Sequence, residues 1–87
     1  MKKKVVYVVV IVYLSGIADD MADIRTIGVY KEYDKAVEAT KNAIKMEEES
    51  MLEDDYDVDI VNYENEWWIY ESGEVYAIIV INKTTIE

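Results

Sequence analysis

Apolar side chains follow two different patterns along this chain. Residues 5–14 and 75–81 are apolar at odd and even positions alike and are built from Val, Ile and Tyr, with one Leu and one Ala; Lys4 precedes the first run, and the predicted strand is residues 4–14. Such runs are typical of strands that are buried on both faces. Residues 56–63 instead alternate, with Tyr56, Val58 and Ile60 between carboxylates, which predicts a strand with one buried face. Residues 24–30 and 67–70 predict two further strands.

A helical pattern separates the second and third predicted strands. Residues 35 to about 50 are rich in Ala, Lys and Glu, and Asp34 precedes them as a candidate N-cap. One predicted face of this helix carries the apolar and small residues Ala36, Val37, Thr40, Ala43, Ile44 and Met51. Gly28 interrupts the second strand and indicates a bulge or a close backbone approach there. Ser72 and Gly73 predict a hairpin turn between the last two strands.

The predicted element order is β-β-α-β-β-β in a single domain, residues 1–87. Short connections late in the chain favour an α+β fold, in which a mostly antiparallel sheet carries one helix on one face. A 16-residue helix is ~24 Å long and covers one face at most, whereas the runs 5–14 and 75–81 have two apolar faces. Either the sheet curls over itself, or a second copy or another partner covers its other face, or long Tyr side chains cover the outer residues of these central strands.

The N-terminus also has the features of a signal peptide, because Lys2, Lys3 and Lys4 precede ten apolar residues. This run is too short to span a bilayer, which takes about 20 residues. Its β-branched and aromatic composition differs from the Leu- and Ala-rich core of a signal peptide and favours a strand. We therefore expect a cytoplasmic protein.

The composition excludes many kinds of chemistry. The chain has no Cys and no His, which removes thiol nucleophiles, histidine bases, Ser-His-Asp triads and zinc sites with nitrogen or sulfur ligands. Asp55, Asp57, Asp59 and Glu66 match ligand positions of a calcium-binding EF-hand loop, but Ile60 stands where that loop needs Gly. The alternating strand pattern explains the same residues. We predict no enzyme activity, no catalytic residue, no cofactor and no built metal site.

Charge is the most unusual property of the chain. The net charge is −10, and it is concentrated in residues 46–82, which hold twelve carboxylates and no Lys or Arg. Direct binding to nucleic acid or to an anionic membrane is therefore disfavoured. Carboxylates at the C-terminal end of a helix also oppose its dipole. Charge runs usually form a solvated surface, but the self-repulsion here exceeds what solubility alone requires.

The acidic run has a geometry that suggests a partner. Alternate residues of a strand lie about 6.6–6.8 Å apart on one face, so Asp55, Asp57 and Asp59 resemble successive phosphates of a nucleic acid strand. A basic groove that holds DNA or RNA offers the Arg and Lys contacts that such a row needs. The predicted partner-binding carboxylates are Glu47, Glu48, Glu49, Glu53, Asp54, Asp55, Asp57 and Asp59.

Aromatic residues favour an interface as well. The chain has eight Tyr and two Trp but no Phe, so every ring carries a polar group suited to half-buried positions. Trp67 and Trp68 are adjacent in a strand and must point to opposite faces. We expect one in the core and the other outside among Glu64, Glu66 and Glu71. Tyr56, Trp67 and Trp68 complete the set of predicted partner-binding residues.

An acidic chain of 87 residues without Cys or His, with the run 47–59 and an aromatic pair, resembles the small inhibitors that phages and mobile elements encode. These include anti-restriction proteins, anti-CRISPR proteins and uracil-DNA glycosylase inhibitors, several of which are DNA mimics. The resemblance implies an inhibitor of a host enzyme that handles nucleic acid, such as a CRISPR nuclease, bound at its basic groove in the host cytoplasm. The alternative is a small homodimeric structural or regulatory module, with the two-sided apolar sheet as its dimer interface.

Overall fold

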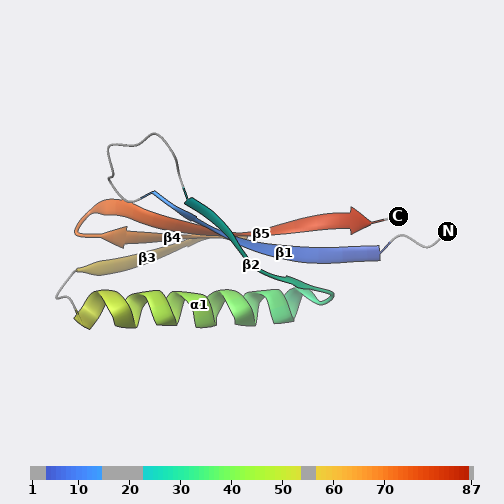
Figure 1. Ribbon diagram of the computed structural model, residues 1–87, viewed down its shortest axis with the longest axis horizontal. Coiled ribbons are helices and arrows are strands. Elements are labelled where there is room, and N and C mark those ends of the chain that lie inside the picture. The colour runs from blue at the N-terminus through green and yellow to red at the C-terminus, as the bar shows by residue number, and fades with distance from the viewer. Residues whose placement is uncertain (1–3, 15–22, 54–56, 87) are drawn as a thin grey trace.

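The computed structural model describes residues 4–14, 23–53 and 57–86. It confirms the predicted element order and the α+β class (Figure 1). The elements are β1 (Lys4–Tyr13), β2 (Asp23–Tyr30), α1 (Tyr33–Glu53), β3 (Val58–Tyr63), β4 (Glu66–Glu71) and β5 (Glu74–Ile86).

The five strands form one sheet in the order β2-β1-β5-β4-β3, and each neighbouring pair is antiparallel. The first and last strands of the chain are therefore neighbours, and Lys4 at the start of β1 lies opposite Ile86 at the end of β5. The two continuously apolar segments take interior positions, where strands bond on both sides, while β2 and β3 form the edges. Their apolar composition explains these interior positions, because an interior strand loses more solvent contact than an edge strand does.

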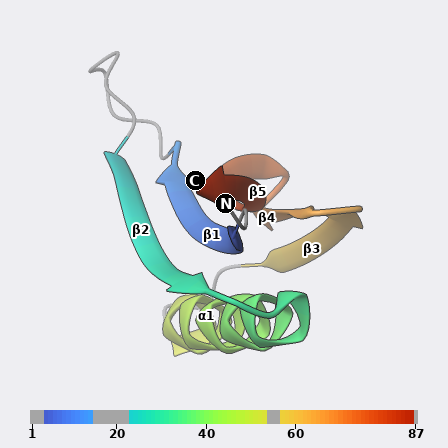
Figure 2. The same cartoon turned by 90° about the vertical axis from the view of Figure 1, so that its right-hand side faces the viewer.

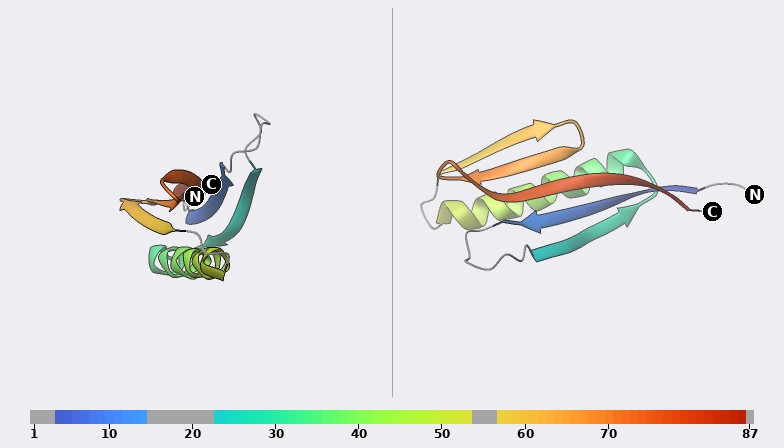
Figure 3. Two further views of the ribbon diagram at one scale, coloured as in Figure 1. Left: turned by 90° about the vertical axis from the view of Figure 1, so that its left-hand side faces the viewer. Right: turned by 90° about the horizontal axis from the view of Figure 1, so that it is seen from above.

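Helix α1 lies against one side of the curved sheet, and no described segment lies on the other side (Figures 2 and 3). We call the side toward α1 the helix face and the opposite side the open face. The predicted arrangement, one helix covering one face, is confirmed. Buried apolar residues come from α1 and from the helix face of β1, β4 and β5. They are Val9, Ile11, Ala36, Ile44, Trp67, Ile69, Ala77, Ile79 and Ile81.

The helix is longer than its sequence pattern predicts. It begins at Tyr33 rather than Lys35 and continues to Glu53 instead of ending near Ser50. The Ala36 amide donates to the Glu32 carbonyl at 3.2 Å, which extends the helical bonding toward the N-terminus. The prediction that Asp34 caps the helix is therefore wrong: Asp34 lies in the first turn, where its charge interacts favourably with the helix dipole.

The buried side of α1 agrees with the predicted stripe. Ala36, Thr40 and Ile44 are buried, and Val37 and Ala43 pack against the core. The Thr40 hydroxyl donates to the Ala36 carbonyl at 2.9 Å, so this fully buried hydroxyl is satisfied within its own helix. The side chain of Met51, the last predicted member of the stripe, lies outside the described residues.

Several strand boundaries also differ from the predictions. Strand β5 continues to Ile86 instead of ending at Ile81, because its polar end pairs with the beginning of β1. Strand β1 ends one residue early, at Tyr13. Strand β3 begins at Val58, and the first residue of its predicted range, Tyr56, lies outside the described residues.

Two local features of the sheet confirm sequence predictions. Ser72 and Gly73 form the turn of the β4–β5 hairpin, with φ of 49° and 88°. Positive φ at both central residues matches the twist that a two-residue hairpin needs. The β1–β2 register shifts next to Gly28, where Ile27 has no partner in β1, so the predicted bulge is present.

Candidate functional site: an acidic end and an open sheet face

Three segments that are distant in the sequence meet at one end of the molecule (Figure 1). They are the C-terminal part of α1, the beginning of β3 and the β4–β5 hairpin. The Ser72 amide donates to the Asp57 carbonyl at 2.8 Å, which fixes the beginning of β3 against the hairpin turn. We call this region the acidic end, and its described carboxylate residues are Glu48, Glu49, Asp57, Asp59, Glu71 and Glu74.

The segments that carry most of the charge of the acidic end supply no base of their own. No Lys or Arg occurs between residues 46 and 82, and the last turn of α1 holds no basic residue. Glu71 and Glu74 are direct cross-strand partners, an arrangement of like charges that destabilises a hairpin. Glu48 and Glu49 lie toward the negative end of the helix dipole. Local stability therefore does not account for this concentration of carboxylates.

Glu47 differs from the other predicted binding carboxylates. Its side chain is turned toward the helix face, where its two oxygens accept hydrogen bonds from Tyr13 Oη at 2.5 Å and Tyr76 Oη at 3.5 Å. The two tyrosine rings contact each other edge to face, 5.7 Å between centroids. Arg25 lies over the Tyr13 ring at 5.7 Å. Glu47 thus links the end of α1 to the sheet, and a partner reaches its carboxylate less readily than that of exposed Glu49.

The tyrosines of this cluster are held in their neutral form. Burial raises the pKa of Tyr13 to about 12, and the hydrogen bond to Glu47 and its negative charge add to the effect. The pKa of Tyr76 is raised for the same reasons, with a contribution from the charge of Glu71. A phenolate beside the Glu47 carboxylate would place two like charges together.

The predicted row of aspartates is only partly described. Asp57 and Asp59 are both exposed at the beginning of β3, and Asp59 lies opposite Tyr70 on the open face. Asp54, Asp55 and Tyr56 lie outside the described residues, as does the side chain of Glu53. The phosphate-like spacing therefore rests on the pair Asp57 and Asp59 within the part of the chain that the structure describes.

Two acidic residues of this end were not among the predicted binding residues. Glu71 and Glu74 flank the hairpin turn, and the β3–β4 and β4–β5 pairings bring them beside Val58 and the start of β3. The sequence did contain a signal for them. A two-residue turn at Ser72-Gly73 makes the preceding and following residues direct partners, so the predicted hairpin already implied a Glu–Glu pair.

The open face is apolar across most of its width. The register places Val8, Val10 and Val12 of β1 beside Val80 and Ile78 of β5. All of these side chains are half-buried, although they belong to interior strands. Exposed Ile24 and Val29 continue the surface onto β2. The sequence argument that these strands have two apolar faces is thus confirmed, and no described residue covers the second face.

The two tryptophans separate as predicted. Trp67 is 8% exposed and belongs to the core, so it is not a surface anchor in the folded chain. Trp68 lies on the open face between Val61 and Ile78, and its indole Nε1 donates to Glu66 Oε1 at 3.0 Å. Its ring is 5.8 Å from that of Tyr63 and 6.4 Å from that of Tyr70. We call Tyr63, Trp68 and Tyr70 the aromatic cluster; Tyr70, opposite Asp59, joins it to the acidic end.

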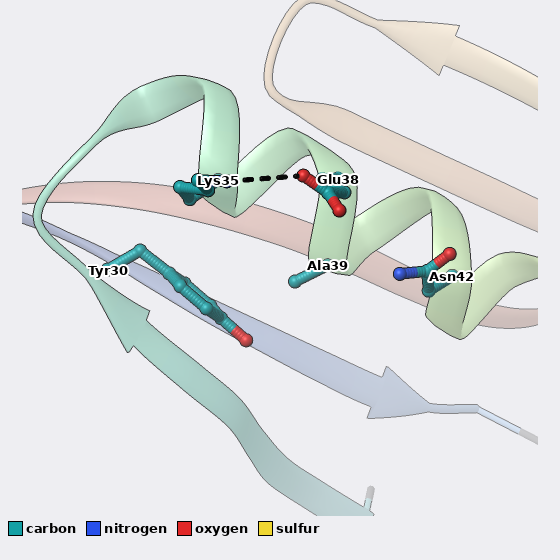
Figure 4. Close-up of a pocket in the computed structure, with 5 residues that line it drawn as sticks. All are labelled: Tyr30, Lys35, Glu38, Ala39 and Asn42. Atoms are coloured by element: carbon teal, nitrogen blue, oxygen red, sulfur yellow. Dashed lines mark ion pairs between the residues drawn. The ribbon is translucent and has the colours of Figure 1, made fainter.

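A hollow of about 280 Å³ lies between β2 and the first turns of α1 (Figure 4). It is lined by Tyr30, Lys35, Glu38, Ala39 and Asn42. Lys35 and Glu38 form an ion pair at 3.9 Å, with both side chains about two-thirds exposed. This volume is at the small end for ligand pockets, and its charged groups pair with each other at the surface. It lacks the enclosed, convergent polar groups of a ligand site.

Two further properties bear on function. Among residues 4–14, 23–53 and 57–86, no group of three or more acidic residues is arranged to hold a metal ion. Within the same residues, no helix is long and apolar enough to cross a membrane.

The chain was also compared with known proteins. No family model, no curated protein and no solved structure gives a significant match to this chain.

Proposed function

We propose that this chain is a non-catalytic inhibitor that binds a host enzyme of nucleic acid metabolism, such as a CRISPR nuclease or a restriction enzyme, in the host cytoplasm. The acidic end would enter the basic groove that normally holds DNA or RNA. One observation carries the proposal: three distant segments converge to concentrate carboxylates for which residues 46–82 supply no base.

The geometry of β3 supports mimicry of a phosphate backbone. Asp57 and Asp59 are two residues apart, about 6.6–6.8 Å along an extended strand, and both are exposed. Exposed carboxylates meet Arg and Lys with the same charge-assisted hydrogen bonds that phosphate oxygens accept. The partner therefore needs cationic side chains spaced along a groove, which is the arrangement that contacts successive phosphates.

The aromatic cluster supports binding to a folded protein surface rather than to a simple polycation. Trp68 is the type of residue that contributes most to protein interfaces, and its ring is already held by Tyr63 and Tyr70. Because this position is ordered before binding, less side-chain entropy is lost in the complex. The cluster adjoins Asp59 through Tyr70, so one partner surface reaches both the anchor and the charge.

The test is a charge reversal with a matched control. We expect Asp57→Lys with Asp59→Lys to weaken capture of the target at least tenfold, because two attractive contacts become repulsive. Glu32→Lys with Glu38→Lys changes the net charge equally but at exposed sites outside the acidic end, and we expect it to retain most of the binding. Equal loss in both variants would show that only net charge matters and would contradict a docking site at the acidic end.

The target is identified by affinity capture from host lysate with tagged chain, repeated with excess DNA and at raised salt. A basic nucleic-acid enzyme that DNA and salt both displace supports mimicry. A captured enzyme that DNA leaves in place contradicts mimicry and indicates inhibition from another surface.

The second candidate function, a homodimeric module without mimicry, is favoured by the apolar open face. It predicts that the Asp57 and Asp59 reversals change no activity of the chain. The two candidates are therefore separated by the same pair of variants.

A further inference from the structure

The part of the open face formed by β2, β1 and β5 is mainly apolar. Its apolar side chains are Val6, Val8, Val10, Val12, Ile24, Val29, Ile78 and Val80, which we call the valine-rich patch. The polar residues among them, Thr26, Asn82 and Thr84, are uncharged. Charged groups of this face lie at the borders of the patch: Lys4 and Lys31 are beside Val6, and Glu66 of β4 is the cross-strand partner of Val80. Asp59 lies farther away, on β3.

We propose that a second copy of this chain packs against the valine-rich patch in a face-to-face, two-fold symmetric dimer. In a two-fold interface the same surface meets itself, so any charge near the axis meets a like charge. The open face of β1 satisfies this requirement, because Val6, Val8, Val10 and Val12 follow one another on it with no ionisable side chain among them. Contact through an uncharged surface adds no further repulsion between two chains that each carry a net charge of −10.

The size of the patch agrees with a dimer interface. Three strands spaced at about 4.8 Å and ten residues rising about 3.4 Å each span roughly 14 by 34 Å, a projected area of about 480 Å². Side chains corrugate this surface, so its accessible area is larger than its projection. Stable interfaces bury about 600–1,000 Å² on each partner, so a dimer at the lower end of this range needs the whole corrugated patch.

The charge distribution selects one orientation of the two copies. The acidic end lies where β1 finishes, and exposed Lys4, Lys31 and Lys83 lie toward the opposite end. With β1 strands antiparallel across the interface, the lysine-bearing end of each copy lies near the acidic end of the other. With the strands parallel, the two acidic ends would meet. The antiparallel dimer therefore has the axis near Val8 and Val10 and exposes one acidic end at each extremity.

Measurement of mass by light scattering, at tens of micromolar chain, tests the dimer directly. We expect twice the 10.1 kDa of one chain for the unmodified protein. Val10→Glu places like charges near the two-fold axis and should halve the measured mass. Met46→Glu adds the same charge at a 72% exposed position on α1 and should remain dimeric. An unmodified chain at 10.1 kDa, or a Val10→Glu variant that folds and stays dimeric, overturns the proposal.

A second experiment does not depend on disrupting the sheet. The chain contains no Cys, so a single introduced thiol reports its own neighbours. We expect Val10→Cys to give a covalent dimer under mild oxidation in at least tenfold higher yield than Met46→Cys. Equal yields at the two positions contradict a two-fold axis near Val10. Both experiments use the purified chain alone, so their outcome is independent of whether the acidic end binds a nucleic-acid enzyme.

Discussion

The two faces of the sheet are made of the same kinds of residue but have different surroundings. Along β1, Val9 and Ile11 face α1 and are 0% and 4% exposed. Their neighbours Val8, Val10 and Val12 face the opposite way and are only half-buried. The difference lies in what covers each face, since an amphipathic helix with a matching stripe covers only the first.

The contrast between the two faces shows how much of the packing a hydrophobic pattern can predict. A run that is apolar at every position indicates that both faces of a strand favour burial, but it does not predict which element covers them. On the helix face the covering element is in the same chain and its stripe is visible in the sequence. On the open face no described residue supplies it, and we propose a second copy.

The largest expected difference between the faces is in the effect of truncating one side chain on each. Ile78 and Ile79 are adjacent in β5, and Ile79 is 0% exposed on the helix face while Ile78 is half-buried on the open face. Ile79→Ala leaves a cavity among well-packed neighbours and should lower the free energy of unfolding by about 3–4 kcal/mol. Ile78→Ala should cost about 1 kcal/mol in the monomer.

Chemical denaturation at several chain concentrations measures both effects. In a dimer, the cost of Ile78→Ala should grow with concentration, because the native assembly loses interface contacts that the unfolded chain lacks. The cost of Ile79→Ala should stay constant. Similar losses for the two variants at low concentration would mean that the open face is packed as tightly as the helix face.

The sequence predicted most of the fold because its patterns were local. The alternation around Val58 and Ile60, the stripe on α1 and the turn at Ser72-Gly73 each depend on residues a few positions apart. Strand order was not predictable, because the pairing of Lys4 with Ile86 joins the two ends of the chain. The polar end of β5 was missed for the same reason, since only its partner in β1 makes it a strand.

The candidate site was predictable in composition but not in arrangement. The acidic run indicated a concentration of charge, and the structure adds Glu71 and Glu74 to it through the hairpin. Glu47 was grouped with the binding carboxylates because its neighbours in the sequence are acidic. Its bonds to Tyr13 and Tyr76 span more than two dozen positions, and no local pattern reports them.

A smaller effect should appear at alkaline pH, in the polar cluster at the margin of the helix face. Burial and the neighbouring Glu47 raise the pKa of Tyr13 from the ordinary tyrosine value of 10.0 to about 12. Above pH 10 the unfolded chain loses this proton while the native chain keeps it, so the native state binds more protons and its stability falls as pH rises toward 12. Because the Tyr13 side chain is partly exposed to solvent, its raised pKa contributes only about 1–2 kcal/mol to the free energy of unfolding.

Denaturation between pH 9 and 12 compares the unmodified chain with Tyr13→Phe and Glu47→Gln. We expect a shallower loss of stability with pH in Tyr13→Phe, which has no proton to lose at this position. Glu47→Gln keeps an acceptor but removes the charge, so its slope should be intermediate. Identical slopes in all three proteins would exclude coupling between the Tyr13 phenol and Glu47.

The smallest expected effects come from changes of one or two methyl groups at the bulge of β2 and at the residue beside it. A Cβ on Gly28 would lie 2.5 Å from Tyr30 Oη and 2.8 Å from two ring carbons, so the ring must move for Ala to fit. Because the obstacle is a side chain and not backbone, Gly28→Ala should cost only about 1 kcal/mol. On a Tyr30→Ala background the same change should cost nothing, giving a coupling of similar size in a double-mutant cycle.

Val29→Ala, at a 58% exposed site on the open face, should cost less than about 0.5 kcal/mol in the monomer although it removes two methyl groups. Both variants are measured at chain concentrations too low for dimers. If Val29→Ala then lowers the free energy of unfolding more than Gly28→Ala does, the proposed contrast between the two faces is wrong at this edge of the sheet.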